Sequence, residues 1–340
     1  MKILLVSPTI YALPPTGYSG TEMIVTVLSK EYQKAGHQVA VMAPEGSTLP
    51  EGTELLPVPL RCQEEAAHEK HKERYPEFDI IHDHTFGSWV YLSSIGVDPP
   101  LPIVKTFHTD PSVWLRPPPI QHPCLVGISR NHARRLAMHL GITCEYVYNG
   151  IDLELYKPPP DDSKRNGRLL FLGRYTNEKG PLEAMVLAKR LRMPLDCYGD
   201  MEIVNSPEYI DRCRREADGV LVRVFPGVSR ERTVELYQTY RALVYTPNWS
   251  EPFGLVLAEA QACGLPVVTL ERGSMPEVVK DGVSGYVCDD IAQMEQVLKD
   301  GCLSRIKTED SVAWAAQFSV QKMAIGYLNL FDRLRRGDRW

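Results

Sequence analysis

Short apolar runs alternate with longer amphipathic runs along the whole 340-residue chain. The short runs, such as KILLVS and HQVAVMA, are continuous in apolar residues, which is typical of strands buried on both faces of a parallel sheet. The longer runs, such as TEMIVTVLSKEYQKAG, have apolar residues at helical spacing, and this one closes on Gly36, a residue type that often ends helices. This alternation predicts α/β sheets with helices on both faces.

The predicted elements fall into two sets, which suits two domains of roughly 150 residues each. Residues 156–168 (YKPPPDDSKRNGR) interrupt all periodicity with prolines and charges, so we place the break between the halves there. The predicted strands are KILLVS, HQVAVMA, DIIHDH, PIVKTFH and CLVGIS before it, and RLLFLG, PLDCYG, GVLVRVF, RALVYTP and LPVVTL after it. Helical stretches in the second half begin near Glu178, Pro207, Arg230 and Leu255.

Open α/β sheets bind ligands at the carboxyl ends of their strands. We therefore expect two doubly wound parallel-sheet domains that face each other, with both sets of strand ends on one interdomain cleft. The tail FSVQKMAIGYLNLFDRLRRGDRW has apolar residues at helical spacing, and we expect it to pack a final helix across the structure.

Charge and composition narrow the class of protein. A net charge of −5 and a pI of about 6.0 argue against a nucleic-acid-binding protein. The start, MKILLVSPTIYALPP, is predicted to be a buried strand because its apolar run is too short for a signal peptide, and no segment approaches a membrane span. The eight cysteines form no CxxC pair, so neither a zinc ribbon nor a disulfide framework is indicated. We expect a reduced, cytoplasmic setting.

Two loops at predicted strand ends could bind phosphates. In PPTGYSGTE, residues 14–22, backbone N–H groups at a helix N-terminus could hold a phosphate, although the loop lacks the GxGxxG dinucleotide pattern. In FLGRYTNEKG, residues 171–180, Arg174 and Lys179 follow a buried strand and suit a diphosphate whose charge develops during bond breaking. A plain turn and a solvated loop are the respective alternatives.

Two glutamates bracket an apolar helix in SEPFGLVLAEAQACGLPVV, residues 250–268. Glu251 lies in the loop after the strand RALVYTP, and Glu259 lies two turns further on, so the two carboxylates could reach opposite ends of one elongated ligand. Carboxylates pair well with vicinal hydroxyls of a ribose or a hexose. The alternative makes Glu251 a helix N-terminal charge and Glu259 a solvent-facing residue, but the alanines around Glu259 leave little polar face for it.

Histidines end two of the predicted strands. His82 and His84 close DIIHDH, and His108 closes PIVKTFH. A metal site made of His82, Asp83 and His84 is disfavoured, because successive residues of a strand point to opposite faces, so Asp83 points away from the two histidines. No Asp-x-Asp occurs to hold a cation on a sugar diphosphate. His108 is better placed for a polar contact with a sugar, and a structural role is its alternative.

Together these segments resemble the family 4 retaining glycosyltransferases of the GT-B fold, over nearly the whole chain and in the family's order. SGTE is similar to the GGxE-type loop, HDH and TFH to the matching strand ends, and GISR and YNGID to the close of the first domain. FLGRYTNEKG is similar to the Arg…Lys phosphate loop, and EPFGLVLAEAQACGLPVV, followed by GSMPEVVKDGVSG, to the E-x7-E motif. The spacing in PPTGYSGTE is most like the branch of the avilamycin-pathway glycosyltransferase. Ser19 departs from the family pattern, which commonly has a glycine there.

The resemblance implies an acceptor-binding domain, 1–155 plus 320–340, and a nucleotide-sugar donor-binding domain, 156–319, with the C-terminal helix crossing back to the first. Arg174 and Lys179 would neutralise the leaving diphosphate, Glu259 would hold the ribose, and Glu251 would hold the transferred sugar. The implied catalytic residues are His108, Arg174, Lys179 and Glu251; the donor residues are Gly20, Arg174, Lys179, Glu251, Phe253, Gly254, Leu255 and Glu259; the acceptor-side residues are Tyr18, Ser19, His84 and Trp114.

The function implied is transfer of a hexose from a nucleoside diphosphate sugar, with a UDP-sugar favoured and a GDP-sugar as the alternative, to an acceptor hydroxyl. Anomeric configuration would be retained, and neither a metal nor another cofactor would be needed. A sugar-nucleotide epimerase or a phosphorylase of the same fold is the main alternative, and the missing GxGxxG pattern makes an NAD-dependent dehydrogenase less favoured.

The acceptor is a carbohydrate, a glycoside or a lipid-linked compound under this interpretation. Residues 130–141 (RNHARRLAMHLG) form a basic helical stretch that could touch an anionic membrane through Leu136, Ala137 and Leu140. A solvated helix is the alternative for this stretch. The sequence does not specify an oligomeric state.

Overall fold

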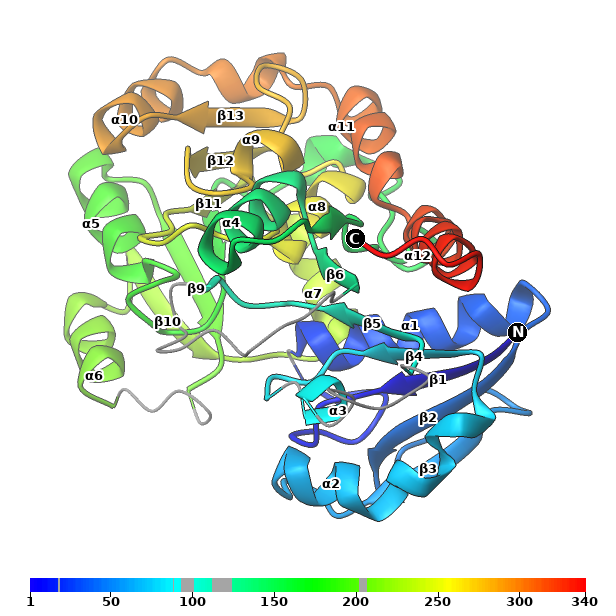
Figure 1. Cartoon of the computed structure of the whole chain (residues 1–340). Helices are drawn as coiled ribbons and strands as arrows, with labels where there is room; N and C mark the ends of the chain where they lie inside the picture. The colour runs from blue at the N-terminus through cyan, green and yellow to red at the C-terminus, as the bar shows by residue number, and fades with distance from the viewer. Residues whose placement is uncertain (18, 88, 93–100, 112–123, 202–206) are drawn as a thin grey trace. The chain divides into compact units, whose positions relative to one another are not determined.

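The computed structural model describes residues 1–17, 19–87, 89–92, 101–111, 124–201 and 207–340. It divides into two compact units, coloured along the chain in Figure 1. Unit 1 comprises Met1–Pro15, Ser19–Gly150 and Val320–Trp340, and unit 2 comprises Thr16–Tyr18 and Ile151–Ser319. Both units are α/β, as the alternating pattern predicts.

Unit 1 contains a sheet of seven strands in the order β3-β2-β1-β4-β5-β6-β7, all parallel. The chain moves outward from β1 to β2 and β3 and then returns to β4 on the other side, so the strand order reverses between β1 and β4. The strands are β1 Lys2–Val6, β2 Gln38–Pro44, β3 Glu54–Val58, β4 Ile80–Asp83, β5 Ile103–Thr106, β6 Cys124–Gly127 and β7 Glu145–Tyr146.

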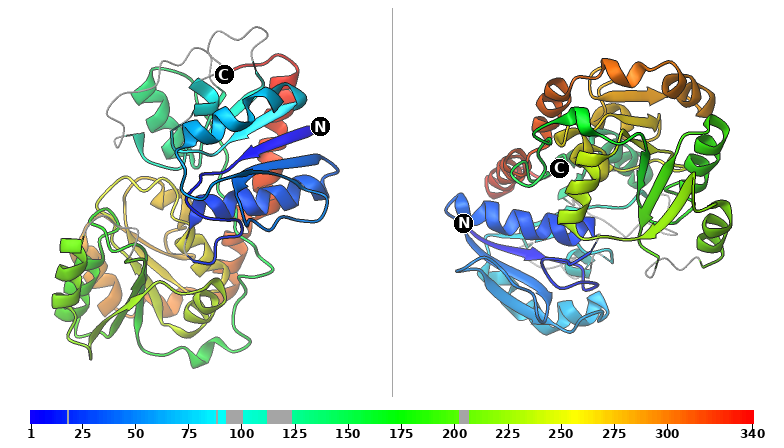
Figure 2. Two further views of the ribbon diagram at one scale, coloured as in Figure 1. Left: turned by 90° about the horizontal axis from the view of Figure 1, so that it is seen from below. Right: turned by 180° about the vertical axis from the view of Figure 1, so that it is seen from behind.

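Among the described residues, unit 1 has the helices α1 Gly20–Lys34, α2 Glu64–His71, the 3-10 helix η1 Lys72–Glu77, α3 Trp89–Leu92, α4 Arg130–Leu140 and α12 Val320–Arg335. The predicted final helix is confirmed as α12, which packs beside α1 within unit 1 (Figure 2). The rings of Phe331 and Tyr32 meet edge to face with centroids 5.6 Å apart, and the Tyr327 hydroxyl lies 3.2 Å from Thr106 Oγ1. The C-terminal residues thus complete the core formed by the N-terminal ones.

Unit 2 repeats the same winding with six parallel strands in the order β10-β9-β8-β11-β12-β13. Its strand order reverses between β8 and β11. The strands are β8 Leu169–Leu172, β9 Leu195–Gly199, β10 Val222–Pro226, β11 Ala242–Tyr245, β12 Val267–Leu270 and β13 Gly285–Cys288. The helices are η3 Asp162–Lys164, α5 Pro181–Leu191, α6 Pro207–Glu216, α7 Arg230–Thr239, α8 Leu255–Ala262, α9 Met275–Val278, α10 Ile291–Lys299, η4 Cys302–Arg305, α11 Thr308–Ala315 and η5 Ala316–Phe318.

All ten predicted strands are present, and three further strands were not predicted. Each of these, β3, β7 and β13, lies at an edge of its sheet and is short or carries a residue that disfavours strands. Pro57 in β3 is tolerated because an edge strand has one side without a ladder. On β3 its carbonyl accepts hydrogen bonds from Lys70 Nζ at 2.7 Å and His71 Nε2 at 3.0 Å, both from α2.

Helix α4, the predicted basic helical stretch, turns Leu136 and Leu140 toward the core. Leu136 is fully buried against Phe107 and Leu125, while Met138 on the opposite side is 74% exposed. None of the helices in the described ranges combines the length and the apolar character needed to cross a membrane. Because Leu136 is buried, it is not available to a membrane, and the predicted contact through this residue is wrong. Contact of α4 with a membrane surface through its exposed residues stays a prediction.

Substitution of Gly285, the first residue of β13, tests how closely this edge strand packs against its neighbour. An added Cβ there would lie 2.1 Å from the Val267 carbonyl oxygen, whereas a Cβ at Gly167 would meet nothing within 4 Å. We expect Gly285→Ala to lower the free energy of unfolding by about 1–3 kcal/mol, because backbone atoms must move apart. Gly167→Ala should change it by about 0.5 kcal/mol or less. Urea titration of both variants checks this, and equal stabilities would contradict it.

Candidate active site

The predicted donor residues of unit 2 gather where its strand order reverses. The loop 173–180 follows β8 and the loop 246–254 follows β11, and these two strands are neighbours in the sheet. In open α/β sheets this switch point is where ligands bind. The structure therefore places Arg174, Lys179 and Glu251 at the expected position within unit 2.

Lys179 and Glu251 form a buried ion pair. Lys179 Nζ lies 2.9 Å from Glu251 Oε1 and 2.7 Å from Oε2, and the two residues are only 8% and 4% exposed. The Glu251 carboxylate also accepts hydrogen bonds at Oε2 from the Tyr245 hydroxyl at 2.5 Å and from Trp249 Nε1 at 2.9 Å. One carboxylate thus joins the loop after β8 to the loop after β11.

Electrostatics keep Glu251 ionised. Burial opposes its charge, but the charge of Lys179 and the hydrogen bonds from Lys179, Tyr245 and Trp249 outweigh burial and hold the pKa of Glu251 below its usual value. Burial, reinforced by the nearby charge of Arg174, lowers the pKa of Lys179, while Glu251 opposes that shift. The Glu251 interaction therefore stabilises the fold above the ordinary pKa of a glutamate, and this stability is lost as the pH falls through the lowered pKa.

Close backbone contacts fix the two loops. Gly180 has φ +71°, and a Cβ there would lie 1.8 Å from the Thr246 carbonyl oxygen, so only glycine allows the loop after β8 to lie against the end of β11. Because the loop continues to Gly180, helix α5 begins at Pro181 and not near Glu178 as predicted. From the other side, the Ser274 hydroxyl and N–H both donate to the Glu251 carbonyl at 2.9 Å.

Helix α8 begins without a side-chain cap. Its N-cap residue, Gly254, has φ +80° and no side chain to accept from the first turn. The N–H groups of Gly254 and Leu255 donate no hydrogen bond within the part of the chain that the structure describes. Phe253 is buried, with its ring 5.5 Å from that of Phe318. An anion at this helix start would find unpaired N–H groups.

Glu259 lies in the second turn of α8 and is 7% exposed, so the solvent-facing alternative is wrong. The Tyr237 hydroxyl donates to its Oε2 at 2.9 Å, and Tyr156 also bonds to it. Burial raises the pKa of Glu259 against the opposing effects of Arg230 and the two tyrosine hydroxyls. Glu251, at 4% exposed, is likewise no surface charge.

Arg174 is the unpaired cation of this site. Its guanidinium has no hydrogen-bond or ion-pair partner among the described residues, and its side chain is half-buried. Its charge acts on the neighbouring Lys179. A cation that is held near the site without a partner is available to an anionic ligand.

The sequence analysis did not predict the four aromatic partners of the glutamates. Tyr245 and Trp249 bind Glu251, and Tyr156 and Tyr237 bind Glu259. Tyr245 and Trp249 stand within six residues of Glu251, so their spacing could have indicated this role. Tyr237 comes from α7 and Tyr156 from the segment before η3, and nothing in their local sequence indicates the contact.

In unit 1 the predicted residues lie at the carboxyl ends of β1, β4 and β5, which are neighbours. Ser19 is the N-cap residue of α1, but its hydroxyl donates to the Glu22 carboxylate and caps no backbone N–H. Gly20 is the first residue of α1. Tyr18 and Trp114 lie outside the described residues, so their predicted roles stay predictions.

The histidines of unit 1 have different surroundings. His82 is fully buried, and its ring nitrogens lie 3.1 Å from the Tyr32 hydroxyl and 2.9 Å from Thr106 Oγ1, so it is a core residue. His84 is also fully buried, and its Nδ1 lies 2.9 Å from Nε2 of the half-buried His108. Within the described ranges, no three His, Cys, Asp or Glu side chains are grouped so that they could hold a metal ion.

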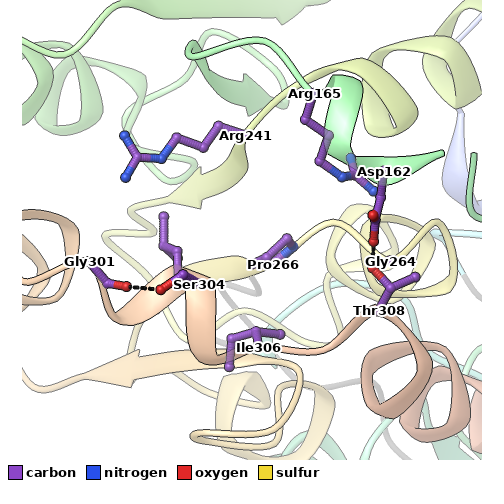
Figure 3. A pocket seen from close by; sticks show the side chains of 10 residues that line it. Asp162, Arg165, Arg241, Gly264, Pro266, Gly301, Ser304, Ile306 and Thr308 are labelled. Carbon is purple, nitrogen blue, oxygen red and sulfur yellow. Dashed lines mark hydrogen bonds between the residues drawn. The ribbon is translucent and has the colours of Figure 1, made fainter.

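A cavity of about 290 Å³ in unit 2, shown in Figure 3, lies beside the amino-terminal ends of β11 and β12. The candidate site lies at the carboxyl ends of β8 and β11. Arg241 and Pro266 line the cavity, just before β11 and β12 begin, and none of the predicted site residues does. Arg165 Nη atoms donate to the carbonyls of residues 237, 240 and 263, and Asp162 accepts from Thr308, so these polar groups hold the fold together. Arg241 has a guanidinium without a partner among the described residues.

Two family descriptions match successive parts of the chain. "Glycosyltransferase Family 4" matches residues 18–155, and "Glycosyl transferases group 1" matches residues 156–304. The chain belongs to the family 4 glycosyltransferases. The D-inositol 3-phosphate glycosyltransferase of Mycolicibacterium smegmatis is 33% identical over 196 residues, which cover 52% of this family 4 chain and 44% of the relative. The chain spans about half the length of the curated relatives it matches.

Solved structures confirm the GT-B fold of this family 4 chain. It is similar to AviGT4, a glycosyltransferase involved in avilamycin A biosynthesis, at 24% identity with a TM-score of 0.76 over 100% of this chain and 99% of that one. It is also similar to Alr3699/HepE of Anabaena in complex with UDP and glucose, at 16% identity with a TM-score of 0.73 over 98% and 99%. The predicted likeness to the avilamycin-pathway enzyme is confirmed.

The buried ion pair of the family 4 chain can be tested by a double-mutant cycle. Lys179→Met and Glu251→Gln should each lower the free energy of unfolding by about 3–5 kcal/mol at neutral pH, because each leaves a buried charge without its partner. The double variant should lose much less than the sum of the two single losses. Urea titration of the four proteins measures the coupling, and additive losses would show that the two side chains do not depend on each other.

Proposed function

We propose that the chain transfers a hexose from a nucleoside diphosphate sugar to an acceptor hydroxyl with retention of anomeric configuration and without a metal. The observation that carries this proposal is the unpaired Arg174 guanidinium beside the Lys179–Glu251 pair and the uncapped start of α8. Residues 156–319 would bind the donor, and residues 1–155 plus 320–340 would bind the acceptor. We further propose a cytoplasmic location.

A UDP-sugar is the favoured donor. The structural relative from Anabaena is in complex with UDP and glucose, and the curated relatives are named as glycosyltransferases. A GDP-sugar is the alternative. The acceptor would be a carbohydrate, a glycoside or a lipid-linked compound, and the half-buried His108 would contact the sugar beside the reacting centre.

The leaving diphosphate needs positive charge as its bond to the sugar breaks. Arg174 supplies an unpaired guanidinium, and the N–H groups of Gly254 and Leu255 supply dipoles at a helix start. Lys179 adds a second cation, although Glu251 holds it in the free protein. Gly20, at the start of α1, would offer a further N–H group to the diphosphate.

The two glutamates would position the donor and leave bond formation to the substrates. Within the described part of the chain, Glu251 Oε1 accepts only from Lys179, so it retains a lone pair for a hexose hydroxyl. Its Oε2 is occupied by Lys179, Tyr245 and Trp249. A carboxylate held by so many donors is a poor nucleophile. This supports front-face attack by the acceptor through an oxocarbenium-like ion pair, with no covalent glycosyl-enzyme intermediate of the kind that retaining glycosidases form.

Arg174→Ala tests the proposed function with little effect on folding, because its side chain has no partner to lose. We expect thermal shift with a panel of UDP- and GDP-sugars to identify the donor first. With that donor, Arg174→Ala should lower kcat about 100- to 1,000-fold. Arg241→Ala is the matched control. It removes another unpaired guanidinium of unit 2, which lies at the amino-terminal end of β11 and away from the candidate site. Equal activity of both variants would overturn the proposal.

The same assay separates the alternative activities. A phosphorylase would consume the nucleotide sugar only when phosphate is added, and an epimerase would convert it without any acceptor. Transfer that depends on an acceptor hydroxyl and proceeds without phosphate is the expected result.

Glu259→Gln should weaken donor binding more than it slows the chemical step. A neutral amide accepts weaker hydrogen bonds from ribose hydroxyls, so the Kd of the donor should rise about tenfold or more, while kcat changes less. Glu216→Gln is the control. It makes the same change in a carboxylate on α6 that pairs with Lys189. Isothermal titration gives Kd, and an unchanged Kd would refute the role of Glu259.

Donor affinity should also depend on pH through Glu259. Its pKa is raised in the free protein, and ribose hydroxyls favour the ionised form, so donor binding lowers that pKa and releases a proton. Affinity is therefore full above the pKa of free Glu259 and falls as the pH drops through it. The Glu259→Gln variant should lose this dependence, and a pH profile of Kd that matches wild type would contradict the assignment.

A further inference from the structure

His84 and His108 are joined by a direct hydrogen bond at the carboxyl ends of the neighbouring strands β4 and β5 in unit 1. His84 Nδ1 lies 2.9 Å from His108 Nε2, and the two ring planes are inclined by 28° with centroids 5.2 Å apart. His84 is fully buried beneath the half-buried His108. Such a buried side chain is better placed to hold His108 than to touch an acceptor, which differs from the acceptor-side role that the sequence suggested for His84.

The free nitrogens of the pair differ in their surroundings. His84 Nε2 is buried and has no hydrogen-bond partner, unlike the two nitrogens of His82, which are both bonded. His108 Nδ1 has no partner in the described part of the chain either, but its ring reaches the surface. His108 Nδ1 is therefore the nitrogen that a substrate could reach.

Only one nitrogen of each neutral ring carries a proton, so the shared hydrogen bond fixes both tautomers together. If His84 donates from Nδ1, its buried Nε2 is a bare acceptor. If His108 donates from Nε2, His84 must carry its proton on Nε2 and leave a buried N–H without an acceptor. Buried N–H groups without a partner are the rarer of the two in proteins. The first arrangement is therefore favoured, and it puts a proton on His108 Nδ1.

We propose that His84 is a positioning residue that holds His108 in the tautomer with its proton on Nδ1, so that His108 presents an N–H donor to a hydroxyl or ring oxygen of the bound sugar. The hydrogen bond from His108 to the sugar rests on the proposed function, whereas the tautomer of His108 does not.

The proton of His108 stays on a neutral ring. Burial, with the charges of Lys105 and His132, lowers the pKa of His108 to about 3. Lys105 is itself fully buried and lies 3.3 Å from Asp83, so this environment is fixed by the core. A neutral ring that accepts at Nε2 from His84 has no basic nitrogen left for the substrate. His108 thus donates a hydrogen bond and does not remove a proton from the acceptor.

Nitrogen-15 NMR of histidine-labelled protein without ligand tests the tautomer. In wild type the His108 signals should show a protonated Nδ1 and a bare Nε2, assigned by their loss in His108→Ala. In His84→Phe, which removes the donor, His108 should shift toward the Nε2-protonated tautomer. His84→Gln should keep the wild-type tautomer, because its amide N–H can still donate. A wild-type His108 protonated at Nε2, or one unchanged by His84→Phe, would overturn the proposal.

Kinetics test whether His84 acts through His108. His84→Phe should lower kcat/KM about 10- to 100-fold, as loss of other outer-shell partners does, and His84→Gln should restore most of it. In a His108→Ala background, His84→Phe should cause no further loss. Additive losses would show that His84 acts independently and would overturn the positioning role. If no variant, including wild type, transfers sugar, the proposed function fails while the NMR result on the tautomer still stands.

Discussion

The Lys179–Glu251 ion pair is the interaction on which the site of unit 2 depends. The pair joins the loop after β8 to the loop after β11, the two strands between which the sheet reverses its order. Two unpaired charges in this environment would each be costly, so the loops keep their positions only together. Gly180 and Ser274 support the same arrangement from either side, one by allowing close approach and the other by binding the Glu251 carbonyl. In the free protein the charge of Lys179 is thus already neutralised by Glu251.

Because Glu251 neutralises Lys179, the two cations Lys179 and Arg174 differ in how freely their charge can act on a ligand. Lys179 has a partner before any ligand arrives, whereas the Arg174 guanidinium has none among the residues that the structure describes. Under the proposed function, the charge of Arg174 would be available to the diphosphate of the donor at once, whereas Lys179 would contribute only to the extent that the ligand draws it from Glu251. The same event would free an oxygen of the Glu251 carboxylate for the sugar, so under the proposed function diphosphate binding and sugar binding would be coupled through Glu251.

The fold followed from the sequence wherever a signal was local. Continuous apolar runs predicted ten strands, namely the nine interior strands and the edge strand β10, and helical spacing predicted α12. The edge strands β3, β7 and β13 were missed because an edge strand needs little hydrophobicity and tolerates Pro57. In the site, the charged residues Arg174, Lys179, Glu251 and Glu259 stood out in the sequence because charges beside buried strands are unusual. Their pairing did not, since Lys179 and Glu251 are 72 residues apart and only the sheet order makes them neighbours.

Pro57 has a consequence for how molecules of this chain meet one another. An exposed sheet edge is a template on which a second chain can add a strand. At Pro57, near the end of edge strand β3, there is no N–H to donate, and the carbonyl already accepts from Lys70 and His71. An approaching strand finds neither a donor nor a free acceptor there, only two basic side chains. Pro57 is also the residue that kept β3 from being predicted. It thus protects this edge of the sheet against aggregation.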